Sequence, residues 1–192
     1  MYGDEEIIKK RVAAGDAKLH NINSTVKIDG VDYSFNRREF DFGISMIVPE
    51  AFEEIPEQIA QMKFPSVYRP KTILANEGCR VCLAFNDIEP LSEAIDIEVL
   101  EFRSYIKKIR PANVFFTHGI YDLPSGMRIG HYDYSYPVAN GDLYNITFLT
   151  NLADMGLLGG FICPAEAKDK WEPLVRQMIQ SIELIEVKNN VW

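Results

Sequence analysis

The sequence lacks a paired set of cysteines and has no long run of apolar residues. It contains three cysteines in 192 residues, so a secreted scaffold held by disulfides is not expected. The most apolar stretch, residues 157–163, is far shorter than the roughly 18 residues that a membrane-spanning helix needs. The acidic start at residues 4–6 is unlike the basic start and apolar run of a secretion signal. These absences predict a cytoplasmic protein.

Basic residues are also in deficit. The chain has 20 Lys and Arg against 28 Asp and Glu, a formal net charge of −8. An acidic surface repels phosphate backbones and anionic lipid, so neither nucleic acid nor a membrane surface is expected as the main partner. The short basic clusters at 9–11, 37–38 and 107–110 are more typical of helix ends and solvated turns. The 47% hydrophobic content suffices for one sizeable core.

We predict that residues 1–35 form an appendage to a single α+β domain that spans residues 36–192. Residues 4–14 have a helical pattern, acidic at the start and basic further on, as the helix dipole favours. Two short alternating segments, 26–28 and 31–35, flank Asp29-Gly30, which is a strong signal for a hairpin with a type I′ turn. This helix and hairpin are candidates for docking on a partner or on a second copy of the chain.

The main domain alternates strand-like and helix-like segments. After a polar turn at 36–39, apolar residues alternate over 40–48 and predict a half-buried strand. Apolar residues at three- and four-residue spacing predict two long helices, over 90–109 and 168–184. A short helix is expected over 53–62, and further strands over 72–74, 80–85, 114–117, 127–136, 143–150 and 156–163. Tight turns between strands favour antiparallel pairing, so the predicted fold class is α+β, an antiparallel β-sheet core flanked by helices.

Two motifs invite a catalytic or metal-binding interpretation. Cys79 and Cys82 have the spacing of a redox pair, but they follow a turn into a strand, and a zinc site would need two more ligands. Ordinary buried cysteines are therefore the favoured interpretation. His131, Asp133 and Ser135 share one face of one strand, too far apart to touch as a catalytic triad. Because the chain also lacks nucleotide-binding glycine motifs, we expect no cofactor and no metal.

Two other groups of residues suit contact better than chemistry. Tyr132, Tyr134 and Tyr136 alternate along one side of a predicted strand, and tyrosine combines a large area with a hydrogen-bonding tip. Glu93 and Asp96 belong to an acidic run that lacks the pattern of a calcium loop. A solvated helix face explains this run most simply, and electrostatic contact with a basic partner is its alternative use.

The order of strands and turns resembles that of PsbP-like domains. The segment 42–52, a strand running into Pro49, is similar to the opening of these domains, and the similarity continues through 73–85, 134–144 and the ending from Phe161 to Ile182. The group includes the photosystem II PsbP subunit, the Mog-type Ran-binding proteins and bacterial DcrB-like proteins, among them the Eag-type chaperones of secreted effectors. The resemblance covers about residues 36–185 and implies a PsbP-like sandwich that binds other molecules. It assigns no role to any single residue.

Three functional hypotheses follow. The first is a non-catalytic protein-binding or adaptor domain, of which a chaperone of another protein is one form. The second is a hydrolase-like enzyme with a site assembled from His118, Asp122, His131 and Asp133, which requires these groups to gather in one cleft with perturbed pKa values. The third is a sensor of a small ligand held between sheet and helix, and it is not separated from the first by sequence.

Overall fold

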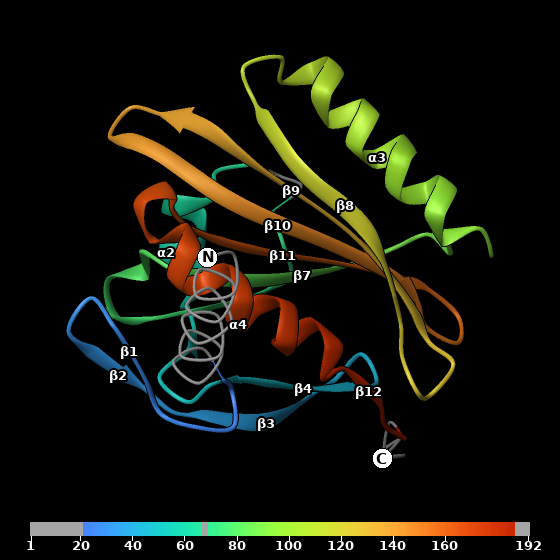
Figure 1. Cartoon of the computed structure of the whole chain (residues 1–192), viewed down its shortest axis with the longest axis horizontal. Helices are drawn as coiled ribbons and strands as arrows, with labels where there is room; N and C mark the ends of the chain where they lie inside the picture. Colours follow the sequence, from blue (N-terminus) through green and yellow to red (C-terminus); the bar gives the residue numbers. More distant parts are fainter. Residues whose placement is uncertain (1–20, 67–68, 187–192) are drawn as a thin grey trace, which may run out of the picture.

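A seven-stranded antiparallel sheet forms the centre of the molecule, with its strands in the order β5-β6-β7-β11-β10-β9-β8 (Figure 1). The computed structural model describes residues 21–66 and 69–186. The strands are β5 (Glu53–Glu54), β6 (Thr72–Ala75), β7 (Cys82–Ile88), β8 (Val114–Asp122), β9 (Arg128–Val138), β10 (Gly141–Asn151) and β11 (Gly156–Pro164). All neighbours in this sheet pair antiparallel, which confirms the predicted sheet core.

Two smaller sheets and three α-helices surround the large sheet within the described residues. One small sheet has the order β12-β4-β3, and β1 pairs with β2 in a separate hairpin. Their bounds are β1 (Val26–Ile28), β2 (Val31–Tyr33), β3 (Phe35–Phe40), β4 (Ile44–Pro49) and β12 (Glu183–Leu184), and the helices are α2 (Glu57–Lys63), α3 (Ile95–Ile109) and α4 (Lys168–Gln180). No helix in these ranges is long and apolar enough to cross a membrane.

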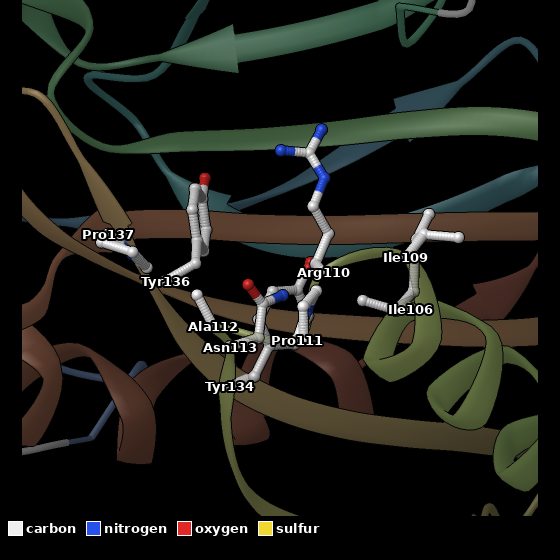
Figure 2. Close-up of a pocket in the computed structure, with 9 residues that line it drawn as sticks. All are labelled: Ile106, Ile109, Arg110, Pro111, Ala112, Asn113, Tyr134, Tyr136 and Pro137. Atoms are coloured by element: carbon white, nitrogen blue, oxygen red, sulfur yellow. The ribbon is translucent and has the colours of Figure 1, made fainter.

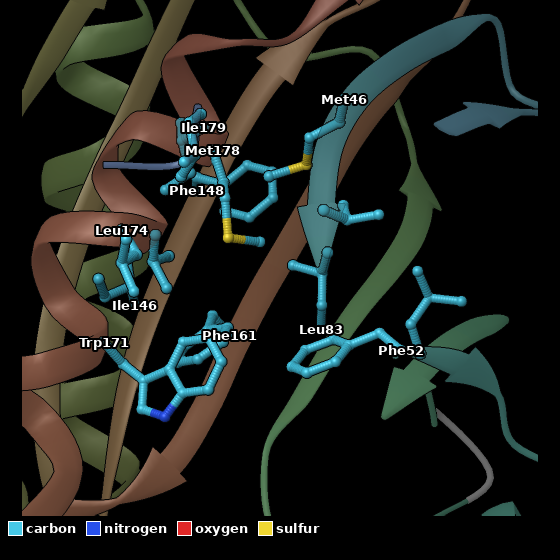
Figure 3. Close-up of a cluster of buried hydrophobic side chains, with 14 of the residues drawn as sticks. Met46, Phe52, Leu83, Ile146, Phe148, Phe161, Trp171, Leu174, Met178 and Ile179 are labelled. Atoms are coloured by element: carbon cyan, nitrogen blue, oxygen red, sulfur yellow. The ribbon is translucent and has the colours of Figure 1, made fainter. Parts of the chain in front are cut away.

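One face of the large sheet, the inner face, is closed by α4 and β4 (Figure 3). Phe148 and Phe161 point from β10 and β11 into this layer, where they meet Trp171 of α4 and Met46 of β4. These side chains are buried because alternate residues of a strand project to the same face, and each apolar set finds a partner across the layer. The opposite, outer face carries α3 at one end and α2 at the other.

The N-terminal hairpin forms around Asp29-Gly30 as predicted. Both residues have positive φ, 50° and 85°, as the two central positions of a type I′ turn require. Tyr33 of β2 meets the Trp171 ring edge to face, with 5.0 Å between ring centroids. The hairpin therefore contributes to the same buried cluster as the inner face. The helix predicted over 4–14 lies outside the described residues.

The strand predicted over 40–48 is wrong, because a reversal of the chain interrupts it. β3 ends at Phe40, residues 41–43 turn, and β4 begins at Ile44, with Phe40 and Ile44 as partners. Gly43 has a φ of 87°, a left-handed conformation that glycine adopts without a Cβ clash. The predicted polar turn at 36–39 is β3 itself, and its polar residues are tolerated because β3 is an edge strand.

The helix boundaries also differ from the prediction at single residues. Pro56 precedes α2 as its N-cap, so the helix begins later than the expected residue 53. The long helix α3 begins at Ile95 rather than at residue 90. After α4 ends at Gln180, the chain extends as β12 and pairs with β4 instead of continuing as a helix to residue 184.

Candidate binding site

The outer face of the sheet is covered at its two ends and open in the middle. At one end, Ile95 and Val99 of α3 pack on Tyr132. A Cβ on Gly130 would lie 2.1 Å from Val99 Cγ2, so this glycine allows α3 to approach the sheet closely. At the other end, Ala60 of α2 packs on Ala84 and its small neighbours. In the part of the chain that the structure describes, no helix lies above the strands between these two contacts.

A hollow of about 540 Å³ lies at the C-terminal end of α3 (Figure 2). The end of the helix and the loop that follows it form one wall, and the last outer residues of β9 form the other. Its lining residues are Ile106, Ile109, Arg110, Pro111, Ala112, Asn113, Tyr134, Tyr136 and Pro137.

A second, smaller hollow of about 160 Å³ continues across β10, β11 and β7 toward α2. It is lined by Phe64, Pro70, Ala84, Phe85, Asn86, Asn145, Thr147, Leu158, Gly159, Gly160 and Ile162. The two hollows adjoin, because Tyr134 of the first is the cross-strand partner of Asn145 in the second. We call the two together the outer groove.

Small and polar residues form the floor of the outer groove. A Cβ built on Gly160 would meet only Asn145 Nδ2 within 4 Å, at 3.7 Å, so the space above this glycine is open. Asn145 is 6% exposed and its Oδ1 accepts a hydrogen bond from the Thr147 hydroxyl, 2.7 Å away. Its Nδ2 finds no acceptor among the described residues. The groove thus offers an amide donor to whatever occupies it.

The tyrosines of β9 form a ladder of rings along the outer face. Tyr134 lies 5.2 Å from Phe115 and 5.8 Å from Tyr136 between ring centroids. Burial raises the pKa of Tyr134, and burial together with Tyr134 raises the pKa of Tyr136 to about 12. Both hydroxyls therefore stay neutral at physiological pH and can donate or accept a hydrogen bond.

The residues predicted as a contact surface are not all placed together. Tyr132 is 2% exposed beneath α3, so only Tyr134 and Tyr136 line the outer groove. Glu93 precedes α3 and Asp96 lies in its first turn, where both are exposed and Asp96 lies 3.9 Å from Arg128. A 15-residue helix is roughly 22 Å long. The acidic residues and the tyrosine hollow are therefore at opposite ends of α3.

A network of buried polar groups occupies the inner face, between α4 and β8. Asp133 of β9 is fully buried, and its Oδ1 accepts from Thr117 N and Thr117 Oγ1 at 2.7 and 2.6 Å. Its Oδ2 accepts from the Tyr144 hydroxyl at 2.7 Å and lies 3.6 Å from Arg176 Nη2. The Thr117 contacts hold the irregular segment of β8 between Phe115 and His118 in place.

Arg176 of α4 is the centre of this network. It donates to Glu172 at 2.8 Å and to the Tyr121 hydroxyl at 3.1 Å, and it lies 3.4 Å from His131 Nδ1. Burial opposes its charge, but the hydrogen bonds to Tyr121 and Glu172 raise the pKa of Arg176. Burial and the neighbouring Arg176 charge lower the pKa of His131 to about 4. The network satisfies its own members and holds α4 against the edge of the sheet.

The four residues of the enzyme hypothesis are divided between two environments. His131 and Asp133 are buried in the Arg176 network, whereas His118 and Asp122 are exposed on β8. Asp122 forms an ion pair with Arg128, 3.0 Å away. None of these four groups lines either hollow of the outer groove, and within the described residues no group of three or more His, Cys, Asp or Glu side chains is placed to hold a metal ion.

The three cysteines are unpaired. Burial raises the pKa of Cys82 to about 11 and that of Cys163 to about 12, so both remain thiols at neutral pH. A redox thiol needs the opposite shift. The C-x-x-C spacing therefore corresponds to a turn residue, Cys79, followed by a buried strand residue.

Sequence reasoning missed the residues that shape the outer groove. Arg110 was assigned to a solvated helix end, and no binding role was predicted for Asn145, Thr147 or Gly160. The available signal was weak: polar residues at alternate positions of β10, and a Gly-Gly pair within β11. Whether such positions line a groove or lie under a helix depends on where α3 and α2 pack.

Comparison with known proteins places the fold. No protein-family model matches the sequence, and no curated protein matches it either. Among solved structures, the cyanobacterial PsbP of Synechocystis superposes with a TM-score of 0.58 and 10% identity, over 84% of this chain and 98% of that one. A Pseudomonas aeruginosa protein of unknown function gives a TM-score of 0.47 at 11% identity, over 77% and 94% of the two chains. The chain therefore has the PsbP-like α+β fold that its strand order predicted.

Proposed function

We propose that this chain is a non-catalytic protein-binding domain whose partner occupies the outer groove. The observation that carries the proposal is the open stretch of sheet between α3 and α2, with two tyrosines and an unsatisfied amide donor on its floor. Tyrosine and apolar side chains at the centre of a concave surface are typical of protein interfaces. The PsbP-like fold supports this proposal only by analogy.

The borders of the outer groove add exposed apolar area. On α3, Ile109 lines the first hollow and is 48% exposed, and Tyr105, one helical turn before it, is 61% exposed. On α2, Met62 is 82% exposed, and Phe64 just after it lines the second hollow. Apolar side chains gathered around a groove mark an interaction site more often than isolated ones do. A chaperone of another protein is the form of binding that such borders favour.

A small-ligand sensor is the second candidate, because the volume of the first hollow lies within the roughly 300–1,000 Å³ of known ligand sites. The protein-binding proposal is preferred because the exposed apolar residues extend beyond the hollow to both helices. The acidic net charge makes a protein partner more fitting than nucleic acid or a membrane. Three unpaired cysteines are in keeping with a cytoplasmic location, which we include in the proposal.

Affinity capture from a lysate of the protein's own host tests this proposal. The bait is the tagged chain, compared with the double variant Tyr134→Ala/Tyr136→Ala. We expect the wild type to retain one partner in stoichiometric amount and the double variant to retain at least tenfold less, since it loses both ring contacts. A matched control is Phe116→Ala, because Phe116 is an exposed aromatic residue whose ring contacts Lys168 and Tyr144, away from the groove.

Thermal unfolding of all three proteins shows that each one is folded before capture. If the double variant retains as much partner as the wild type, the partner does not bind in the outer groove. If Phe116→Ala loses as much partner as the double variant, the loss is not specific to the groove, and the assignment of the binding site is also contradicted. A wild-type bait that retains no protein contradicts protein binding itself and favours the small-ligand candidate.

A further inference from the structure

A cationic side chain extends into the first hollow of the outer groove. Arg110 is the C-cap residue of α3, and it lines the hollow with Tyr134 and Tyr136. Figure 2 shows its guanidinium and the Tyr136 hydroxyl pointing in the same direction, away from the backbone that carries them. Among the described residues, the Arg110 side chain makes neither a hydrogen bond nor an ion pair. Its fork of donors therefore remains available to a bound group.

The surroundings of Arg110 are positive in a protein that is negative overall. Lys107 and Lys108 lie in the last turn of α3, next to Arg110, and no acidic residue lines the hollow. Burial raises the pKa of Tyr134 and Tyr136, and the Arg110 charge acts in the opposite direction on both. The guanidinium therefore acts on the two hydroxyls across the hollow. An anionic group placed there would meet one cation and two neutral donors.

Apart from Asn113, the rest of the lining is apolar. Ile106 and Ile109 contribute the helix wall, Pro111 lies beside Arg110, and Pro137 lies beside Tyr136 (Figure 2). Such a lining excludes a strongly hydrated anion but accommodates an anionic group that is attached to an apolar body. A planar carboxylate matches the fork of a guanidinium in a bidentate contact, and hydroxyl donors satisfy its remaining lone pairs.

We propose that this hollow binds the C-terminal carboxylate of the protein partner, flanked by apolar residues. This inference rests on the proposed function and adds to it the charge of the recognised segment. Arg110 holds the carboxylate, Tyr134 and Tyr136 donate to it, and the isoleucine wall contacts the neighbouring apolar side chain. Asn145, adjacent to Tyr134 in the sheet, donates to a carbonyl of the same segment.

A titration of the ¹⁵N-labelled chain followed by NMR tests the carboxylate directly. The probes are the dipeptide acetyl-Leu-Leu with a free carboxylate and the same dipeptide as its amide. We expect the carboxylate form to shift the amide signals of residues 110, 112, 113 and 136 in a saturable manner, and to bind at least fivefold more tightly than the amide. Equal binding of the two probes, shifts scattered over the surface, or no shift at millimolar probe would overturn the inference.

Two variants assign the effect to Arg110. Arg110→Gln is expected to abolish the preference for the carboxylate while leaving the fold intact, because the side chain is exposed and unpaired in the described structure. Arg128→Gln is the matched control, since Arg128 is also exposed but pairs with Asp122. A preference that survives in Arg110→Gln overturns the inference. Octanoate serves as a third probe: binding of octanoate without binding of the dipeptide replaces the protein partner with a free carboxylic acid and also overturns it.

Capture with the Arg110→Gln bait separates this inference from the proposed function. If the wild type captures a partner and Arg110→Gln captures tenfold less of it, the result supports both the carboxylate inference and the proposed function. If both baits capture the partner equally, the carboxylate inference fails and protein binding through the groove stands. If no bait captures a protein but the dipeptide carboxylate binds at Arg110, the proposed function fails and the hollow is a small-ligand site.

Discussion

Two consecutive glycines on β11 show how differently the two faces of the sheet are built. A Cβ on Gly159 would lie 2.0 Å from Phe148 Cζ on the inner face, whereas a Cβ on Gly160 would meet only Asn145 Nδ2 at 3.7 Å on the outer face. Position 159 requires glycine because the Phe148 ring occupies the space where a Cβ would lie. Gly160 leaves open a space that no described residue fills. The same residue type therefore serves close packing on one face and a groove on the other.

The contrast extends to polar groups. On the inner face, Asp133 and Arg176 are surrounded by partners within the protein, and each donor or acceptor adds to the same network. On the outer face, Asn145 Nδ2 and the Arg110 guanidinium remain without a partner among the described residues. Arg110 is exposed, so its guanidinium carries no burial penalty and is available to a ligand, which supports the proposal that the outer face binds the partner.

The largest expected change in stability comes from a substitution on the inner face. Trp171 is 1% exposed and packs against Tyr33 and Phe161 at centroid distances of 5.0 and 5.4 Å. Trp171→Ala should lower the free energy of unfolding by about 3–5 kcal/mol, because it leaves a large cavity. On the outer face, Tyr136→Ala should cost less than about 1.5 kcal/mol, since Tyr136 is half-buried. Urea unfolding measures both, and similar costs would remove the distinction between the faces.

Alanine at each of the two glycines should have a smaller effect on stability, and the effect should again differ between the two faces. Gly159→Ala should lower the free energy of unfolding by about 1–3 kcal/mol, since the new Cβ forces the Phe148 ring to move. Gly160→Ala should change it by less than about 0.5 kcal/mol, because its Cβ enters open space. Thermal and urea unfolding of the pair measure this difference. A cost for Gly160→Ala as large as that for Gly159→Ala would show that the groove is closed in solution.

Stability should also depend on pH, and this dependence originates in the inner network. The pKa of His131 is about 4 in the folded protein against 6.5 as the ordinary value. Between these values the unfolded chain binds more protons, so stability is fully present above pH 6.5 and is lost as the pH falls toward 4. A slope of at most about 1.4 kcal/mol per pH unit implies a loss of about 2 kcal/mol between pH 7 and pH 5.

His131→Gln tests this dependence, because glutamine does not titrate in this range. The variant should lose about 2 kcal/mol less than the wild type over the same interval, measured as urea midpoints at pH 7 and pH 5. His118→Gln is the comparison, since His118 is exposed on β8 and its charge contributes less to the lowered pKa of His131 than burial and Arg176 do. If His131→Gln follows the wild-type pH dependence, the buried neutral state of His131 is contradicted.

Local patterns predicted most elements of the fold. The Asp29-Gly30 turn, the four strands from 114 to 163 and both long helices depend on spacing that neighbouring residues supply, and all are present. The reversal at residues 41–43 was missed because Phe40, Phe42 and Ile44 continue an apolar alternation across it. Only the positive φ of Gly43 marks the turn, and a backbone angle leaves little trace in a pattern of apolar residues.

The arrangement of the outer face was predicted in part. The alternation of side chains along β9 correctly predicted that the tyrosines lie on the opposite face of the sheet from His131 and Asp133. It did not separate Tyr132 from Tyr134 and Tyr136, because that division depends on where α3 crosses the sheet. Arg110 and Asn145 are 35 residues apart in the sequence and reach the same groove only through the register of β9 with β10.

The sequence by itself determined the class of fold, the antiparallel pairing and the face of each strand residue, because these follow from turns and from a period of two or 3.6 residues. The tertiary structure alone decided which outer residues a helix covers, which glycine borders a ring and which arginine has partners. These outcomes depend on contacts between residues far apart in the chain, and such contacts arise only when helices and sheets pack together.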